Sequence, residues 1–109
     1  MEKINRNILI ITVRADFGGG PEHIYSLIKE LHKENNFYIA CPDDFPYKNK
    51  YTDILGKNRI ILIPHRKFKL SYLFGLKNYV KYHEINIIHS HGKGAGIYGR
   101  FLSVISGIP

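Results

Sequence analysis

The chain of 109 residues lacks features that mark several classes of protein. Its one cysteine, Cys41, has no partner for a disulfide, and one thiolate does not make a zinc site, so a reducing cytoplasm fits best. The apolar run at residues 8–11 is far shorter than the roughly 20 residues of a membrane span. We therefore expect a single cytoplasmic domain with no leader and no transmembrane segment.

Acidic residues are also scarce. Nine Asp and Glu stand against sixteen Lys and Arg, which gives a formal charge of +7. This excess favours an anionic partner, such as a phosphate ester, a nucleic acid or an acidic lipid surface. A solvated basic surface explains the charge equally well, and we expect no nucleic-acid partner.

Four short apolar runs alternate with segments of helical spacing. This alternation predicts a Rossmann-like α/β fold, with a parallel sheet of order 3-2-1-4 and helices on both faces. In that order the first and fourth strands are neighbours, and their helices leave toward opposite faces, which opens a ligand crevice. The strands are predicted at residues 7–13, 37–41, 59–64 and 86–90, and the helices from Pro21 to near Glu34, at 47–55, at 70–83, and after the fourth strand to near Gly107.

Glycine-rich loops follow the first and the fourth predicted strands. The first holds Gly18, Gly19 and Gly20, and the second holds Gly92 and Lys93. Glycines let a backbone approach a ligand, and the free amides of a helix start attract phosphate. A flexible turn is the alternative for either loop alone, but two such loops on one crevice, with a mobile lysine, suit a diphosphate or a sugar phosphate.

Neither loop matches a standard nucleotide-binding fingerprint. The dinucleotide pattern meets His23 where its third glycine should stand, and the P-loop requires Ser or Thr after Gly-Lys, where this chain has Gly94. Asp43 at the end of the second strand leaves a nicotinamide-binding half-domain open as an alternative.

Two histidines, His89 and His91, share one face of the fourth strand. We expect His91, at the strand tip, to look into the crevice and to hydrogen-bond a sugar hydroxyl. We interpret His89 as a satisfied core histidine. No carboxylate or thiolate clusters with the pair in sequence, so we expect no metal. The remaining histidines are interpreted as surface or packing residues: His23, His32, His65 and His83.

Residues 19–22 (Gly-Gly-Pro-Glu), 86–92 (Asn-Ile-Ile-His-Ser-His-Gly) and 94–109 resemble the N-terminal domain of family 4 glycosyltransferases. The resemblance implies a GT-B architecture of two Rossmann-like domains. It also implies retaining transfer of a sugar from a nucleotide-diphosphate donor to a glycan or lipid-linked acceptor, in cell-envelope polysaccharide synthesis, with no further cofactor.

By the same resemblance, Gly19 and Gly20 approach the donor diphosphate and His91 lies beside the transferred sugar. Gly18, Gly92 and Lys93 would line the substrate site. Residues 1–109 correspond to only part of the acceptor-side domain, so we expect the chain alone to be inactive without the rest of that domain and the C-terminal donor domain. The basic rim of the 70–83 helix suggests peripheral contact with phosphates at the inner face of the membrane.

Overall fold

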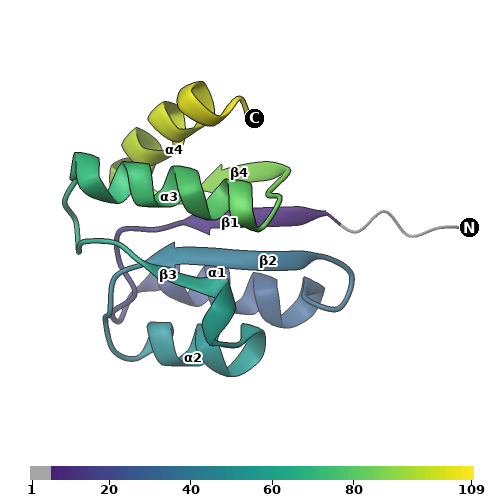
Figure 1. Ribbon diagram of the computed structural model, residues 1–109. Coiled ribbons are helices and arrows are strands. Elements are labelled where there is room, and N and C mark those ends of the chain that lie inside the picture. The colour runs from purple at the N-terminus through teal and green to yellow at the C-terminus, as the bar shows by residue number, and fades with distance from the viewer. Residues whose placement is uncertain (1–5) are drawn as a thin grey trace, which may run out of the picture.

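Four short apolar strands form a parallel sheet in the order β3-β2-β1-β4, as the sequence predicts (Figure 1). The structure is a computed structural model that describes residues 6–109, apart from the side chain of Lys93. In the register of the sheet, Ile10 lies between Ile39 and His89. The strands are β1 (Asn7–Ile11), β2 (Asn36–Cys41), β3 (Ile60–Leu62) and β4 (Ile87–Ser90).

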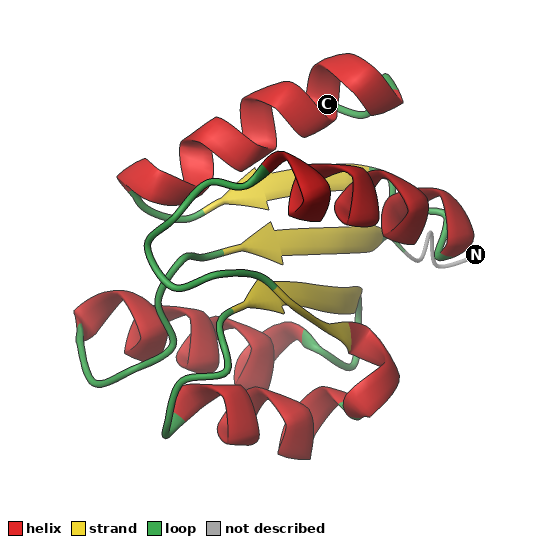
Figure 2. Ribbon diagram, turned by 60° about the vertical axis from the view of Figure 1, so that its left-hand side comes forward, coloured by secondary structure: helices red, strands yellow, loops and turns green. Residues whose placement is uncertain are grey.

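Helices cover both faces of this sheet, with α1 and α2 on one face and α3 and α4 on the other (Figures 1 and 2). A short 3-10 turn, η1 (Lys57–Arg59), leads into β3. None of the helices in the described part of the chain is long and apolar enough to cross a membrane. The helices are α1 (Gly19–Leu31), α2 (Tyr47–Leu55), α3 (Leu70–Tyr82) and α4 (Lys93–Ser106).

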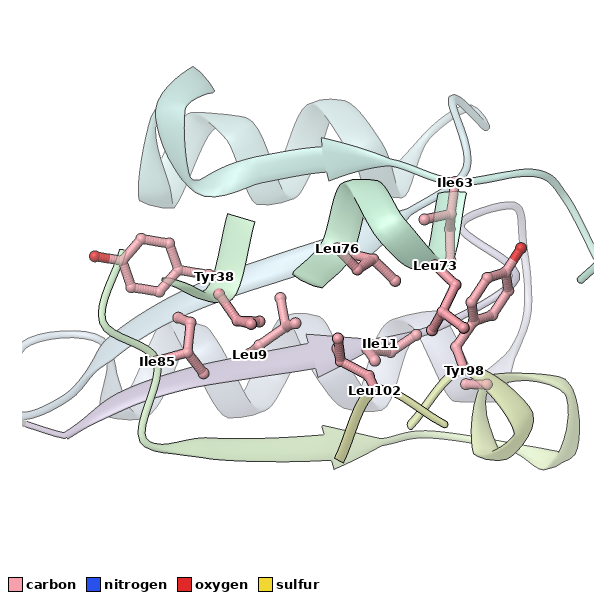
Figure 3. Close-up of a cluster of buried hydrophobic side chains, with 12 residues drawn as sticks. Leu9, Ile11, Tyr38, Ile63, Leu73, Leu76, Ile85, Tyr98 and Leu102 are labelled. Atoms are coloured by element: carbon pink, nitrogen blue, oxygen red, sulfur yellow. The ribbon is translucent and has the colours of Figure 1, made fainter. Parts of the chain in front are cut away.

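Alternate residues of β1 supply two separate cores. Leu9 and Ile11 point toward α3 and α4 (Figure 3), whereas Ile10 joins the core beneath α1 and α2. Burial of each such side chain stabilises the fold by about 1.5–3 kcal/mol. On the face shown in Figure 3, the helices contribute Leu73, Leu76, Tyr98 and Leu102.

The first strand and the first helix differ at their ends from the prediction. β1 stops at Ile11 because Thr12 turns the chain: its hydroxyl donates to the Arg14 carbonyl at 3.0 Å. α1 begins at Gly19, so Pro21 is its third residue rather than its first. Proline is tolerated there because the first amides of a helix have no intrahelical acceptor.

The prediction that His89 is a core residue is wrong. His89 is exposed, although it lies beside Ile10, which is buried. β4 is the edge strand of the sheet, and within residues 6–109 no helix covers this part of it on the face of α1 and α2. The side chain instead borders a hollow that it shares with Leu27 and Phe37.

The connection between β3 and α3 is tied to α4 through Tyr98. The buried Tyr98 hydroxyl donates to the Lys67 carbonyl at 2.8 Å and accepts from the Lys69 amide at 3.0 Å. α4 also lies very close to β4, because a Cβ added at Gly99 would overlap the Ser90 side chain. These contacts fix the position of α4 and therefore of the loop that begins it.

Candidate substrate-binding crevice

The two glycine-rich loops meet in one crevice at the carboxyl ends of β1 and β4. Its volume is about 290 Å³. Strand order alone predicts this meeting, and the structure confirms the geometry. The lining contains every predicted site residue whose side chain is described, namely Gly18, Gly19, Gly20, His91 and Gly92, together with Thr12, Val13, Arg14, Pro21, Arg66 and Gly94.

One wall of the crevice is the start of α1. The Gly18 carbonyl accepts the first hydrogen bond of the helix, from the Glu22 amide at 3.2 Å. The amides of Gly19 and Gly20 therefore precede the hydrogen-bonded turns and have no acceptor within the helix. Such amides, together with the dipole of the helix, attract an anion.

The opposite wall is the start of α4. Gly92 precedes this helix with φ of 90°, a conformation that favours glycine. Gly94 lies against Val13, and a Cβ added at Gly94 would come within 2.7 Å of a Val13 methyl group. The side chain of Lys93 lies outside the described residues, so its role in binding substrate stays a prediction.

His91 stands between the two walls. Its amide donates to the Ile11 carbonyl at 2.9 Å, which holds the residue against the end of β1. A Cβ added at Gly20 would lie 3.4 Å from the His91 Nε2 atom, so the glycine leaves room for the imidazole edge. The ring also stacks on that of His23, with centroids 5.6 Å apart and planes 18° apart.

Burial lowers the pKa of His91 below its ordinary value, and the neighbouring His23 and His89 lower it further. The neutral form therefore prevails at neutral pH. A neutral imidazole has one nitrogen that donates and one that accepts, which suits a sugar hydroxyl, since a hydroxyl does both.

Two arginines that the sequence did not single out also line the crevice. The Arg14 guanidinium holds Asp16 in a two-point contact, Nε to Oδ1 at 2.9 Å and Nη2 to Oδ2 at 3.2 Å, and this bond lowers the pKa of the Asp16 carboxyl. Arg66 lies in the connection between β3 and α3, and its amide donates to the Val13 carbonyl at 2.9 Å. Position after β1 was an available signal for Arg14, but none pointed to Arg66.

His23 is a further residue at the site whose role the sequence alone does not show. The sequence predicts a surface or packing residue, and the side chain is indeed exposed, but its ring also stacks on that of His91. The available signal was its place in the dinucleotide-like pattern, one turn into the helix that follows the glycine loop.

The acidic residues near the loops are structural supports. The Glu22 carboxylate accepts the Tyr47 hydroxyl and so joins α1 to α2. Asp44 accepts from the Ala15 amide at 3.1 Å. Asp43, on which the nicotinamide alternative depends, is exposed and lies 3.8 Å from the Lys48 ammonium, away from the crevice lining.

The crevice therefore combines free helix-start amides, two arginine residues and a neutral imidazole. In the range 6–109, no group of three or more His, Cys, Asp or Glu side chains is placed to hold a metal ion. Amides and guanidinium groups bind phosphate oxygens well. The donors thus suit an anionic ligand that carries hydroxyl groups.

This fold and site define a class of protein: a Rossmann-like domain that has a crevice suited to anions at the switch point of its sheet. Comparison with protein families then identifies the family. Residues 17–109 match the model described as Glycosyltransferase Family 4, and the match includes both glycine loops and His91. The chain belongs to glycosyltransferase family 4, as its resemblance implied. Comparison with individual curated proteins found no match.

Proposed function

We propose that this chain forms the acceptor-side part of a retaining glycosyltransferase in cell-envelope polysaccharide synthesis. The enzyme would move a sugar from a nucleotide-diphosphate donor to a glycan or lipid-linked acceptor. Family membership supports sugar transfer in general. The observation that carries the proposal is the convergence of two glycine-lined helix starts and His91 on one crevice.

In this proposal the donor diphosphate lies against the start of α1. The amides of Gly19 and Gly20 donate to phosphate oxygens, and Arg14 and Arg66 offset the negative charge. Asp16 holds the Arg14 guanidinium in place, which lowers the cost of ordering that side chain on binding. Gly18, Gly92 and Lys93 would complete the boundary of the substrate site.

His91 would orient the transferred sugar. Its neutral ring can donate to one hydroxyl oxygen and accept from another hydroxyl group. The stack with His23 and the contact with Gly20 restrict the directions that the ring can take. A restricted ring keeps its hydrogen bonds in one geometry, which is the requirement for positioning a reacting group.

Residues 1–109 would be one part of a larger GT-B enzyme. The rest of the N-terminal domain and a C-terminal donor domain would complete it and would stabilise the charge that develops on the leaving diphosphate. In this proposal the 109-residue chain binds substrate groups weakly and does not turn over by itself.

The test uses a polypeptide in which this chain is joined to a donor domain, with transfer from a nucleotide-diphosphate sugar as the readout. His91→Ala is expected to lower kcat by about 100-fold or more. The matched control is His32→Ala, because His32 lies at the far end of α1, where its ring bonds to backbone carbonyls of that helix. Equal activity of the two variants would show that His91 has no role in transfer.

A second measurement separates the enzyme from a non-catalytic phosphate-ligand or partner-binding module. Calorimetry with a nucleoside diphosphate is run beside the transfer assay on the same two-domain protein. Binding that depends on Gly20, measured with Gly20→Val, together with transfer, supports the enzyme. The same binding without transfer to any glycan or lipid-linked acceptor would favour the module.

A further inference from the structure

Charge is distributed very unevenly along the chain. Residues 1–53 carry seven Lys and Arg and eight Asp and Glu, whereas residues 54–109 carry nine Lys and Arg and a single acidic residue, Glu84. Neither α3 nor α4 contains an acidic residue. The positive charge of the protein therefore belongs to the half that forms α3, β4 and α4.

The outer side of α3 carries a stripe of two apolar residues followed by two lysines. Leu70, Phe74, Lys77 and Lys81 recur at intervals of four, three and four residues, which places them on one line along the helix. Leu70 is 60% exposed and Phe74 is 52% exposed. Different residues of the helix fill the core, so nothing in the packing of the described chain requires these two to be apolar.

A third apolar side chain, that of Phe101 in α4, extends this stripe. The two helices pack side by side (Figures 1 and 2), and Ile105 lines a groove of about 440 Å³ together with Lys77 and Lys81. Phe101 lies one turn before Ile105 on the same side of α4 and is 53% exposed. Its ring is 5.7 Å from that of Phe68, which fixes it next to the start of α3.

We propose that this α3–α4 surface, formed by Leu70, Phe74, Phe101, Lys77 and Lys81, docks on an anionic membrane. The apolar side chains would enter the boundary between headgroups and acyl chains, and the ammonium groups would contact lipid phosphates. The absence of acidic residues from both helices removes the repulsion that an anionic surface would otherwise meet. This inference goes beyond the proposed transfer reaction, and its test does not depend on that reaction.

The first test uses tryptophan as a reporter, because the chain has none. Phe74→Trp is mixed with vesicles of phosphatidylcholine alone or of phosphatidylcholine with phosphatidylglycerol. A blue shift of emission with the anionic vesicles only is expected. Phe45→Trp is the control, since Phe45 is 71% exposed and precedes α2 on the other side of the molecule, and its emission should not shift. Equal shifts in both variants, or none in Phe74→Trp, would overturn the proposal.

The second test measures vesicle binding of lysine variants by sedimentation. Each lysine near an anionic surface strengthens binding by about five-fold, so Lys77→Gln with Lys81→Gln is expected to weaken binding by more than ten-fold. Lys29→Gln with Lys33→Gln removes the same charge at the end of α1 and should change binding less than two-fold, a rough bound for a remote site. All four positions are exposed, so the folded state should survive, and unchanged circular dichroism checks this.

Two results would contradict the proposal that this surface docks on a membrane. Equal losses in both lysine pairs would mean that net charge alone draws the protein to the vesicles. A dimer in sedimentation equilibrium that dissociates on Phe74→Ser, without any vesicle binding by the parent chain, would mean that the surface covers a second copy. Lysine variants that lose vesicle binding but keep transfer activity would leave the proposed function intact. Conversely, His91→Ala is expected to lose transfer activity and to bind vesicles as the parent chain does.

Discussion

The two faces of the sheet are built alike inside and differ outside. On each face, isoleucine and leucine side chains of the strands meet a stripe of helix residues that are almost fully buried. At the surface, α1 and α2 together carry three acidic and three basic residues, while α3 and α4 carry four basic residues and no acidic one. Apolar spacing specifies the fold on both faces, so surface charge is free to serve interaction.

The crevice lies where these two faces meet. α1 reaches it from the face of mixed charge and α4 from the cationic face. Each helix contributes its first turn and one glycine where a side chain would crowd a neighbour. An added Cβ would meet His91 at Gly20 and Val13 at Gly94. The site therefore needs both faces, because neither alone supplies two walls.

The largest expected effect tests whether the two cores are equivalent. Leu76→Ala on one face and Ile28→Ala on the other each remove a side chain that is 0% exposed, and each should lower the free energy of unfolding by about 2–5 kcal/mol. Urea unfolding measures the change. Val104→Ala, at a side chain that is 81% exposed, should stay within about 0.5 kcal/mol. A core variant that behaves like this control would break the equivalence of the faces.

The next effect concerns the close approach of α4 to β4, a feature without a counterpart on the other face. Gly99→Ala would overlap the Ser90 side chain and should cost about 1–3 kcal/mol of unfolding free energy. Gly96→Ala in the same helix meets no atom within 4 Å and should stabilise by up to about 1 kcal/mol, because alanine favours helix. Thermal unfolding of the Gly99→Ala and Gly96→Ala variants measures both changes. If both substitutions stabilised the protein, the close packing of Gly99 on Ser90 would be contradicted.

A smaller effect compares one buried tyrosine from each face. Tyr98→Phe leaves the Lys67 carbonyl and the Lys69 amide without their partner and should cost about 1–2 kcal/mol. Tyr51→Phe removes one bond, to the Pro21 carbonyl at 2.9 Å, and should cost about 1 kcal/mol. Hydrogen exchange of the Lys69 amide should accelerate only in Tyr98→Phe. Acceleration in both variants would mean that the faces open together rather than separately.

The smallest effect is the titration of His91 at the junction of the faces. Its pKa is lowered in the folded protein, so at pH above the ordinary value of about 6.5 it contributes nothing, and below that value the unfolded chain takes up the proton more readily. Stability should therefore fall slightly as pH drops from about 6.5 to the lowered pKa. NMR titration of the His91 ring measures it. His23→Gln should raise the pKa only part of the way, because burial is the larger cause.

Much of the fold could be predicted because the spacing of apolar residues indicates buried strands and amphipathic helices. The helix at 47–55 and the end of β2 at Cys41 have the predicted limits, and the order of the strands is the usual one for a parallel sheet of this alternation. The crevice followed in turn, since the order brings the loops after β1 and β4 together. These features depend on local pattern and on connection rules, which a sequence contains.

The features that could not be predicted depend on what covers or touches a residue. His89 has the position of a core residue in its strand, but burial requires a covering helix, which its strand pattern does not reveal. Arg66 reaches the crevice from a connection with no periodicity, at a φ of 52°. The stack of His23 on His91 joins residues 68 positions apart along the chain, a contact that forms only when the strands assemble into the sheet.

The hydrogen bonds of Tyr98 have a mechanical consequence. Lys67 and Lys69 are both held by its hydroxyl, and the Phe68 ring between them lies 4.8 Å from the Tyr98 ring, so this stretch of the crossover is tied to α4 at three successive residues. Arg66 immediately precedes this stretch and lines the crevice. We therefore expect a tilt of α4 to displace this stretch and, with it, the side of the crevice that Arg66 lines.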